Sequence, residues 1–180
     1  MDGILERSDG QVRLRFTRRL PHPPQAVWRA LTEPDDLAAW FPASIQGAWQ
    51  PGATLRFTFR DPDEAAEVLG VDEAPVLDGR VIAYEPYTRL EYTWEEDTLR
   101  FDLEPDGDGT ILRLTVTFDE IGRAARDAAG WHECLDLLAH RLAGERPTFA
   151  PGERWSEVHG GYVERFGPDA STIGPPESDA

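Results

Sequence analysis

The chain has 180 residues and a formal net charge of −16, from 34 acidic and 18 basic side chains. This length favours one domain over two, and a hydrophobic fraction of 40% is enough for a core, which argues against disorder of the whole chain. Because so acidic a surface repels phosphate groups, the sequence predicts no nucleic-acid partner.

The cysteine count and the first residues indicate the cellular location. Cys134 is the one cysteine, which excludes an intrachain disulfide and a cysteine-based metal cluster. Residues 1–10 are polar and lack the apolar core of a signal peptide. No apolar run approaches the roughly 20 residues that a membrane-spanning helix needs. We therefore expect a cytoplasmic protein without a membrane partner.

Alternation of apolar and polar residues predicts the strands of the first half. Val12–Leu20 alternates over its whole length, which is typical of a half-buried strand. Prolines end this strand, and two short helices follow, over Gln25–Leu31 and Asp35–Phe41. A weak strand over Ala43–Ala48 and a strong one over Thr54–Arg60 come next.

The segment Asp61–Glu73 differs in composition from the rest, with six acidic residues and no basic one. Mutual repulsion of these charges, together with Gly70 and Pro75, opposes a regular element, so we expect a surface loop with little regular structure. The ordered spacing of oxygen ligands in a calcium loop is missing, and the sequence predicts no calcium site here.

Four more strands follow, over Val76–Tyr84, Arg89–Trp94, Thr98–Leu103 and Thr110–Phe118. The connections between them are short and rich in turn-forming residues, which favours antiparallel neighbours. Together with the earlier segments they make a sheet of about seven strands.

The longest helix comes after the last strand and is expected to end at Gly144. Its apolar residues recur every three or four positions and form a stripe that we expect to face the sheet, made of Ala124, Ala128, Trp131, Leu135, Leu138 and Leu142. Trp131, at the centre, should be among its most buried residues. His132 and Glu133 lie beside the stripe and are expected to be partly exposed.

The titratable side chains show no catalytic or metal-binding pattern. Adjacent helical residues such as His132 and Glu133 point about 100° apart, and His132 and His140 lack the spacing of a helical metal pair. Cys134 is expected to be a small core residue rather than a nucleophile. Because no nucleophile elbow or phosphate loop occurs either, the sequence predicts no catalytic residue, no metal and no cofactor.

The end of the chain carries a second amphipathic pattern. Trp155, Val158, Tyr162 and Phe166 recur at helical spacing, so we expect a helix that buries this face on its own domain or on a second copy. The linker is long enough for the chain to double back, which favours its own domain and leaves a homodimer open.

Four segments together carry a resemblance to a known family. They are LPHPPQAVWRALTEPDDLAAWF (Leu20–Phe41), GRVIAYEPYTRLEYTW (Gly79–Trp94), GWHECLDLL (Gly130–Leu138) and WSEVHGGYVERFG (Trp155–Gly167). The first three resemble the START-like superfamily called SRPBCC, and within it the bacterial homologues of the activator of the heat-shock-protein-ninety ATPase. The fourth is similar to an extension of such members. The resemblance implies a helix-grip fold, in which a cavity between sheet and long helix takes small apolar molecules.

These features define an α+β class: a curved antiparallel sheet of about seven strands around a long helix, two short helices after the first strand, and an extra amphipathic helix. We divide the chain into an N-terminal segment (1–10), a START-like domain (11–144), an amphipathic extension (145–167) and a tail (168–180). The tail is rich in Pro, Ser, Asp and Gly, and we expect it to be disordered.

The leading functional hypothesis is non-enzymatic binding of a small hydrophobic or aromatic ligand in that cavity. The side chains expected to line it are Phe57, Phe59, Tyr92, Trp94, Phe101, Trp131, Leu135 and Leu138. Simple filling of the core by these residues is the competing interpretation. A co-chaperone or protein-partner domain also stays open. So does a cyclase- or hydrolase-like enzyme, which needs a polar group in the cavity from Tyr84, Tyr92, His132 or Glu133.

Overall fold

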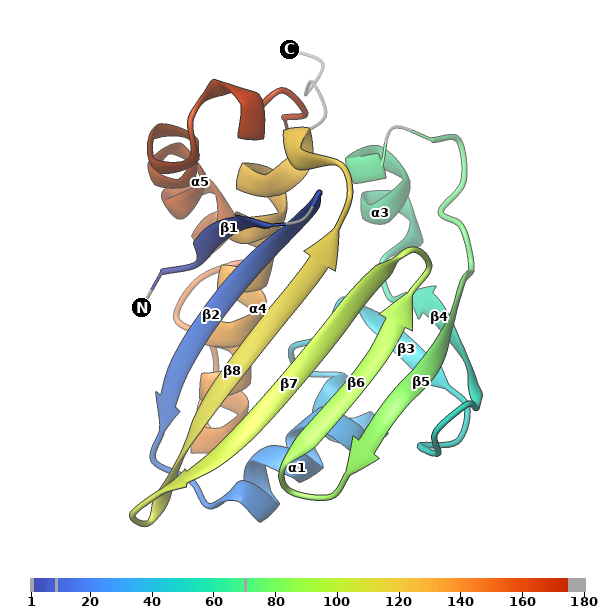
Figure 1. The fold of residues 1–180 in the computed structure, drawn as a ribbon, viewed down its shortest axis with the longest axis vertical. Helices are drawn as coiled ribbons and strands as arrows, with labels where there is room; N and C mark the ends of the chain where they lie inside the picture. Colours follow the sequence, from blue (N-terminus) through green and yellow to red (C-terminus); the bar gives the residue numbers. More distant parts are fainter. Residues whose placement is uncertain (1, 9, 70, 175–180) are drawn as a thin grey trace.

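The computed structural model describes residues 2–8, 10–69 and 71–174, which form one curved sheet with helices against one face (Figure 1). The described strands are all antiparallel and follow the spatial order β1 (Ile4–Ser8), β2 (Gln11–Leu20), β8 (Gly109–Phe118), β7 (Asp97–Asp106), β6 (Arg89–Trp94), β5 (Leu77–Glu85), β4 (Thr54–Phe59) and β3 (Ala43–Gln46). All seven expected strands are present, and the α+β class is confirmed.

The eighth strand, β1, lies in the segment for which no element is predicted. It pairs with β2 in a register that places Leu5 opposite Leu14. β1 is at the edge of the sheet and is joined to β2 by backbone hydrogen bonds, so it does not need the apolar alternation of a central strand. Periodicity alone therefore missed it.

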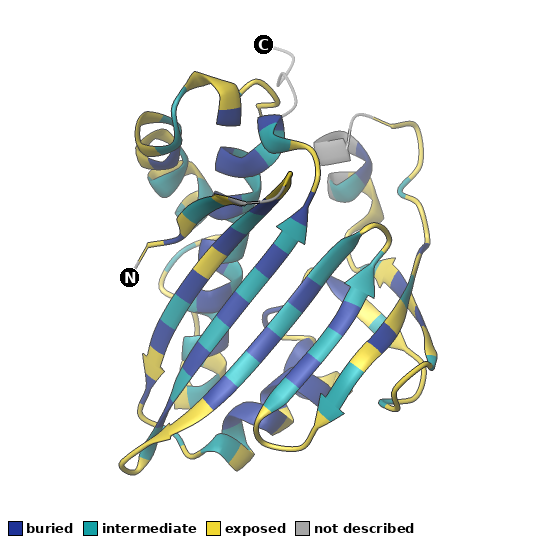
Figure 2. Cartoon of the chain, viewed as in Figure 1, coloured by how far each residue is buried: buried dark blue, intermediate teal, exposed yellow. Residues whose placement is uncertain are grey.

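Buried and more exposed residues alternate along the central strands (Figure 2). On β8, Leu112, Leu114 and Val116 are buried against the helices. On β7, Phe101 points inward, and the neighbouring Arg100 and Asp102 lie on the outer face, where they form an ion pair of 2.7 Å. This alternation follows because successive side chains of a strand point to opposite faces.

The helices α1 (Pro24–Thr32) and α2 (Pro34–Leu37) lie at one end of the sheet, and α4 (Ala124–Ala143) runs along its inner face (Figure 1). The carboxylate of Asp36 in α2 is nearly buried. It accepts from Arg29 at 2.9 Å and from Arg141 at 2.6 Å, which ties α1 and α2 to the last turn of α4. α4 ends, as predicted, at Gly144, which adopts a left-handed φ of 68°.

The predicted amphipathic helix is also present as α5 (Glu153–Phe166), and it packs on α4 of the same chain. Tyr162, at the centre of its apolar face, is fully buried. Residues 168–174, part of the tail for which we expect disorder, also pack on the domain. A short 3₁₀ turn there (Pro168–Ala170) buries Ala170, and the Ile173 amide donates to the carbonyl of Gly122 at 3.0 Å. Residues 175–180 lie outside the described part.

The packing of α5 overturns the expected exposure of α4. His132 and Glu133 are buried, not partly exposed, because α5 covers the face of α4 that points away from the sheet. Trp131 packs against the sheet but is only half-buried, so it is not among the most buried residues of the helix. A helix covered on two sides has no single apolar stripe, and residues beside the predicted one are buried as well.

The acidic segment contains a helix, α3 (Pro62–Leu69), and the prediction of a loop with little regular structure is wrong for these residues. Proline is well suited to the first turn, and an acid such as Asp63 is favourable there because the amino end of a helix carries partial positive charge. Ala66 is buried, which gives the helix an anchor on the domain. The favourable first turn and the burial of Ala66 thus outweigh the repulsion between the acidic side chains of this segment.

Candidate functional site

The structure contains an open cleft of about 1190 Å³ at the end of the sheet where β6 turns into β7. Its walls come from the loop after α2, the end of β4, the start of β5, the stretch of α4 from Arg126 to Leu137 and the start of α5. The cleft therefore lies where sheet and helices separate, and it extends along α4 as far as the middle of that helix.

Aromatic rings form one wall of this cleft, with Trp94 at their centre. Its ring stacks on Phe57 with centroids 5.3 Å apart and meets the edge of Trp131 at 6.2 Å. Phe41 lies 5.0 Å and Phe59 6.1 Å away. Trp94, Trp131 and Phe59 are half-buried, so part of each ring is available to a molecule in the cleft.

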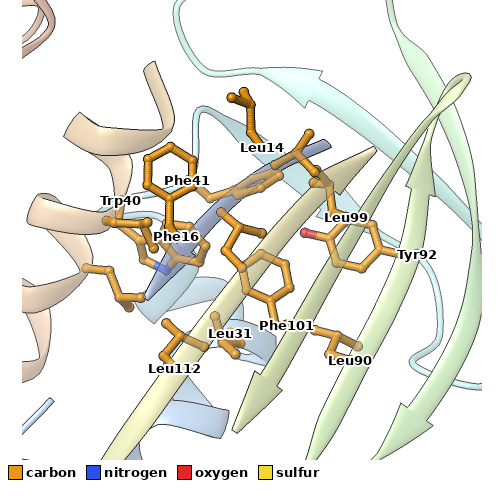
Figure 3. Packing of buried hydrophobic residues seen from close by; sticks show 14 of the residues in the cluster. Leu14, Phe16, Leu31, Trp40, Phe41, Leu90, Tyr92, Leu99, Phe101 and Leu112 are labelled. Atoms are coloured by element: carbon orange, nitrogen blue, oxygen red, sulfur yellow. The ribbon is translucent and has the colours of Figure 1, made fainter. Parts of the chain in front are cut away.

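Three of the eight residues expected to line a cavity do so: Phe59, Trp94 and Trp131. The other five are buried in the core instead, and they are Phe57, Tyr92, Phe101, Leu135 and Leu138. Side-chain packing is the reason: Figure 3 shows Trp40, Phe41, Phe101 and Tyr92 in one buried cluster, in which the rings of Tyr92 and Phe101 are 6.1 Å apart. The Trp40 ring meets Phe101 at 6.2 Å, and burial raises the pKa of the Tyr92 hydroxyl.

Trp40 and Phe41 come from the segment after α2, and sequence reasoning placed them only in a short helix. Trp40 is anchored by a hydrogen bond of 2.8 Å from its indole nitrogen to the carbonyl of Ala30. A buried indole N–H needs such a partner, and this bond holds the ring in the core. Nothing local to the sequence indicates which strand the ring would cover.

Arg123 lies at the mouth of the cleft and joins two elements. Its guanidinium bonds Asp97 at the start of β7 and, at 2.6 Å, Asp127 of α4. It also lies 4.6 Å from the ring centre of Phe118. Burial raises the pKa of Asp97, although the bond to Arg123 opposes this shift. These partners hold β7 and the first turn of α4 together beside the opening.

Glu133 connects the cleft wall to α5. One carboxylate oxygen accepts the amide N–H of Gly152 at 2.9 Å, and the other accepts that of Trp155 at 2.7 Å. These amides belong to the first turn of α5, which lacks a side-chain cap of its own. The indole of Trp155 in turn donates to the carbonyl of Arg126 at 3.1 Å. α4 thus positions the start of α5, which supplies part of the cleft lining.

Beneath α5 lies a separate buried network that does not reach the cleft. The Tyr162 hydroxyl accepts the Gly3 amide at 2.8 Å and lies 2.8 Å from Nδ1 of His132. Nε2 of His132 faces the Asp136 carboxylate at 3.5 Å, which favours a neutral imidazole with its proton on Nε2, so that Nδ1 accepts the proton of the hydroxyl. Burial lowers the pKa of His132, in keeping with this assignment. The network joins the N-terminal segment, α4 and α5.

The proposed sources of a polar catalytic group are mostly elsewhere. Tyr84 packs on Trp28 with ring centroids 5.2 Å apart, Tyr92 is in the core, and His132 lies under α5. Glu133 lines the cleft, but both of its oxygens are occupied by backbone amides.

The thiol of Cys134 and possible metal-ligating side chains are two further features with chemical potential. Cys134 also lines the cleft, and burial raises the pKa of its thiol to about 12, which keeps it protonated at neutral pH. Within the described residues, no cluster of three or more His, Cys, Asp or Glu side chains is placed to hold a metal ion. The same part of the chain has no helix that is both long and apolar enough to cross a membrane.

A second depression, of about 550 Å³, lies on the outer face of the sheet. Its lining is polar and the charged groups pair with one another, as Arg15 does with Glu6 at 2.9 Å and Arg100 with Asp102. It offers no apolar surface comparable to the aromatic wall, so the cleft is the better candidate site.

Comparison with known proteins places this chain in a family. Residues 21–143 match the family described as Activator of Hsp90 ATPase homolog 1-like protein. Among solved structures, the protein encoded by gene BPP1335 from Bordetella parapertussis is 30% identical, with 91% of each chain covered and a TM-score of 0.69. No match was found among curated proteins.

Two more distant structures show the same fold. EF2215 from Enterococcus faecalis, described as a conserved protein of unknown function, is 24% identical over 91% of this chain and 89% of its own, with a TM-score of 0.68. CalU16 from Micromonospora echinospora is 19% identical over 92% of this chain and 97% of its own, with a TM-score of 0.67. The chain therefore belongs to the family of Activator of Hsp90 ATPase homolog 1-like proteins, within the START-like superfamily, as the sequence resemblance predicts.

Proposed function

We propose that this protein binds a small molecule with an aromatic or otherwise apolar body in the cleft and does not convert it chemically. The observation that carries the proposal is the half-buried aromatic wall of Phe59, Trp94 and Trp131 in a cleft of about 1190 Å³. Small-molecule sites in proteins are typically concave, roughly 300–1000 Å³ in volume, and lined by apolar and aromatic side chains with a few polar groups.

The accessible area of the aromatic wall supports a ligand in the cleft. Trp131 stays half-buried although Phe41 lies 6.1 Å away, so part of its ring is open to the cleft. Exposed aromatic area has an unfavourable contact with water, and a ligand that covers it gains that free energy. The cleft is open, so a ligand can enter without unfolding of the wall.

The first experiment is mass spectrometry of small molecules that stay with the natively purified protein. The second is a titration with naphthalene-2-methanol, followed by quenching of tryptophan fluorescence. We expect Trp131→Ala to weaken this binding roughly tenfold, since it removes a ring from the wall. Thr115→Ala, on the outer face of the sheet, is the matched control. If no molecule is retained and the probe does not bind the wild type, the proposal is wrong.

A second candidate function comes from the family description, which names an activator of an ATPase. By this analogy the protein would bind a chaperone of the Hsp90 type. The test is stimulation of such a chaperone's ATP hydrolysis by the purified protein, with a pull-down from native extract beside it. An unchanged ATPase rate and no recovered chaperone would remove this candidate and leave the ligand-binding proposal untouched.

A further inference from the structure

Acidic side chains outnumber basic ones around the cleft. Seven carboxylates and three arginines line it. Each arginine is engaged within the protein: Arg123 with Asp97 and Asp127, Arg126 with Asp127 at 2.9 Å, and Arg60 with the backbone carbonyls of Leu37 at 2.8 Å and Ala43 at 3.2 Å. The guanidinium groups of these three arginines therefore already bind carboxylates or backbone carbonyls of the protein and are not placed to bind an anionic ligand.

The carboxylates on one rim are placed differently. The turn between β6 and β7 carries Glu95 and Glu96, which directly follow Trp94 and are exposed. In the described part of the chain neither forms an ion pair or a side-chain hydrogen bond. Asp78 lies next to this turn, because the Glu95 amide donates to its carbonyl at 2.9 Å. Its carboxylate is 3.6 Å from Arg56, an exposed pair with little mutual stabilisation.

This acidic rim stands beside the half-buried aromatic wall. The face of an indole attracts a cation, and Trp is the strongest of the aromatic residues in this respect. Carboxylates within a few ångströms of the same space add to the attraction and repel an anion. The net charge of −16 gives the whole surface the same preference. The acidic rim and the aromatic wall thus both favour a ligand with a positive charge.

We infer that the ligand of the cleft is an aromatic molecule that carries a positive charge, as a protonated aromatic amine does. The aromatic body packs on Trp94 and Trp131, and the ammonium group lies toward Glu95 and Glu96. This inference rests on the proposed function and narrows it to one class of ligand. A bare metal ion would not use the aromatic wall.

The test uses three probes of one shape and different charge: 2-naphthylmethylamine as a cation, naphthalene-2-methanol as the neutral form, and 2-naphthoate as an anion. Their dissociation constants are measured by isothermal titration calorimetry at neutral pH and low salt. We expect the cation to bind about tenfold more tightly than the neutral probe, and the anion to bind most weakly. Added salt should reduce the difference, since it screens the exposed rim.

The double variant Glu95→Gln/Glu96→Gln tests the assignment to these residues. It should weaken binding of the cation by roughly threefold to tenfold and leave that of the neutral probe unchanged. Glu104→Gln removes a carboxylate from the outer face of the sheet and is the control for the net charge of the chain. It should leave all three constants unchanged.

The outcomes separate the two proposals. Equal binding of the cation and the neutral probe, or tighter binding of the anion, overturns the charge inference while the proposed function stands. A cation preference of undiminished size in the double variant overturns the role of Glu95 and Glu96. If none of the probes binds, the proposed function fails and the inference fails with it.

Discussion

The middle of the sheet and its open end are built from the same strands, but their aromatic side chains differ in burial. Phe57 of β4 and Tyr92 of β6 are fully buried, whereas Phe59 and Trp94, two residues further along the same strands and on the same face, are half-buried. The difference is the number of neighbouring rings. Phe57 lies within 6.5 Å of Phe41, Tyr92 and Trp94, whereas Phe59 has Trp94 at 6.1 Å and faces the open cleft. A step of two residues thus separates a core position from a candidate binding position.

The sharpest test of this comparison is a pair of truncations. Phe101→Ala in the middle should lower the free energy of unfolding by about 3–5 kcal/mol, because it leaves a cavity in a fully buried cluster. Trp94→Ala at the open end should lower it by about half as much, since part of the ring is already in contact with water. Urea denaturation measures both. Equal losses would show that the open end is core as well.

Ligand binding should respond in the opposite order. Trp94→Ala is expected to weaken binding of the naphthalene probe strongly, and the milder core variant Phe101→Leu should change it little, because Phe101 does not line the cleft. Fluorescence titration is the measurement. A comparable loss of binding in both variants would contradict the separation between core and cleft.

The next effect concerns Glu133, which holds the start of α5. Glu133→Ala removes the acceptor of two amides and should cost about 1–3 kcal/mol in the free energy of unfolding. The first turn of α5 should also exchange its amide hydrogens faster, as measured by hydrogen/deuterium exchange. Glu157→Ala, at an exposed ion pair of 2.8 Å on α5, is the control. Unchanged exchange at Gly152 and Trp155 would mean that Glu133 does not position α5.

Acidification should act through His132. Burial lowers its pKa in the folded protein, so the unfolded chain takes up a proton more readily between the lowered pKa and the ordinary value of 6.5. The neutral imidazole contributes its full stabilisation above pH 6.5, and this is lost progressively as the pH falls below that value. The melting temperature of the wild type should therefore fall more between pH 7.5 and 5.5 than that of His132→Gln. His22→Gln, in the loop before α1, should behave like the wild type.

The smallest effect is expected on the outer face of the sheet. Glu104→Ala breaks an ion pair with Arg113 of 2.7 Å in which both side chains are more than a third exposed. Such pairs contribute only about 0.2–1 kcal/mol, and probe binding should not change. A loss as large as that of Glu133→Ala would show that charge pairs on this face have been underestimated.

The sequence by itself determined the strands β2 to β8, the long helix, its end at Gly144 and the amphipathic α5, because periods of 2 and 3.6 residues are local properties of a chain. It also determined the inward faces of β4, β6 and β7, on which Phe57, Tyr92 and Phe101 are buried. The edge strand β1 and the acidic helix α3 were not predicted, because neither depends on a long apolar periodicity of its own.

Only the tertiary structure decided which aromatic residues belong to the core and which to the cleft. Phe57 and Phe59 have the same residue type and face, but rings from other elements surround Phe57, whereas one side of Phe59 faces the cleft. The same holds for His132 and Glu133, which lie outside the predicted apolar stripe but are buried because α5 packs over them. Burial depends on a partner that is distant along the chain, and the spacing of residues within one element carries no information about that partner.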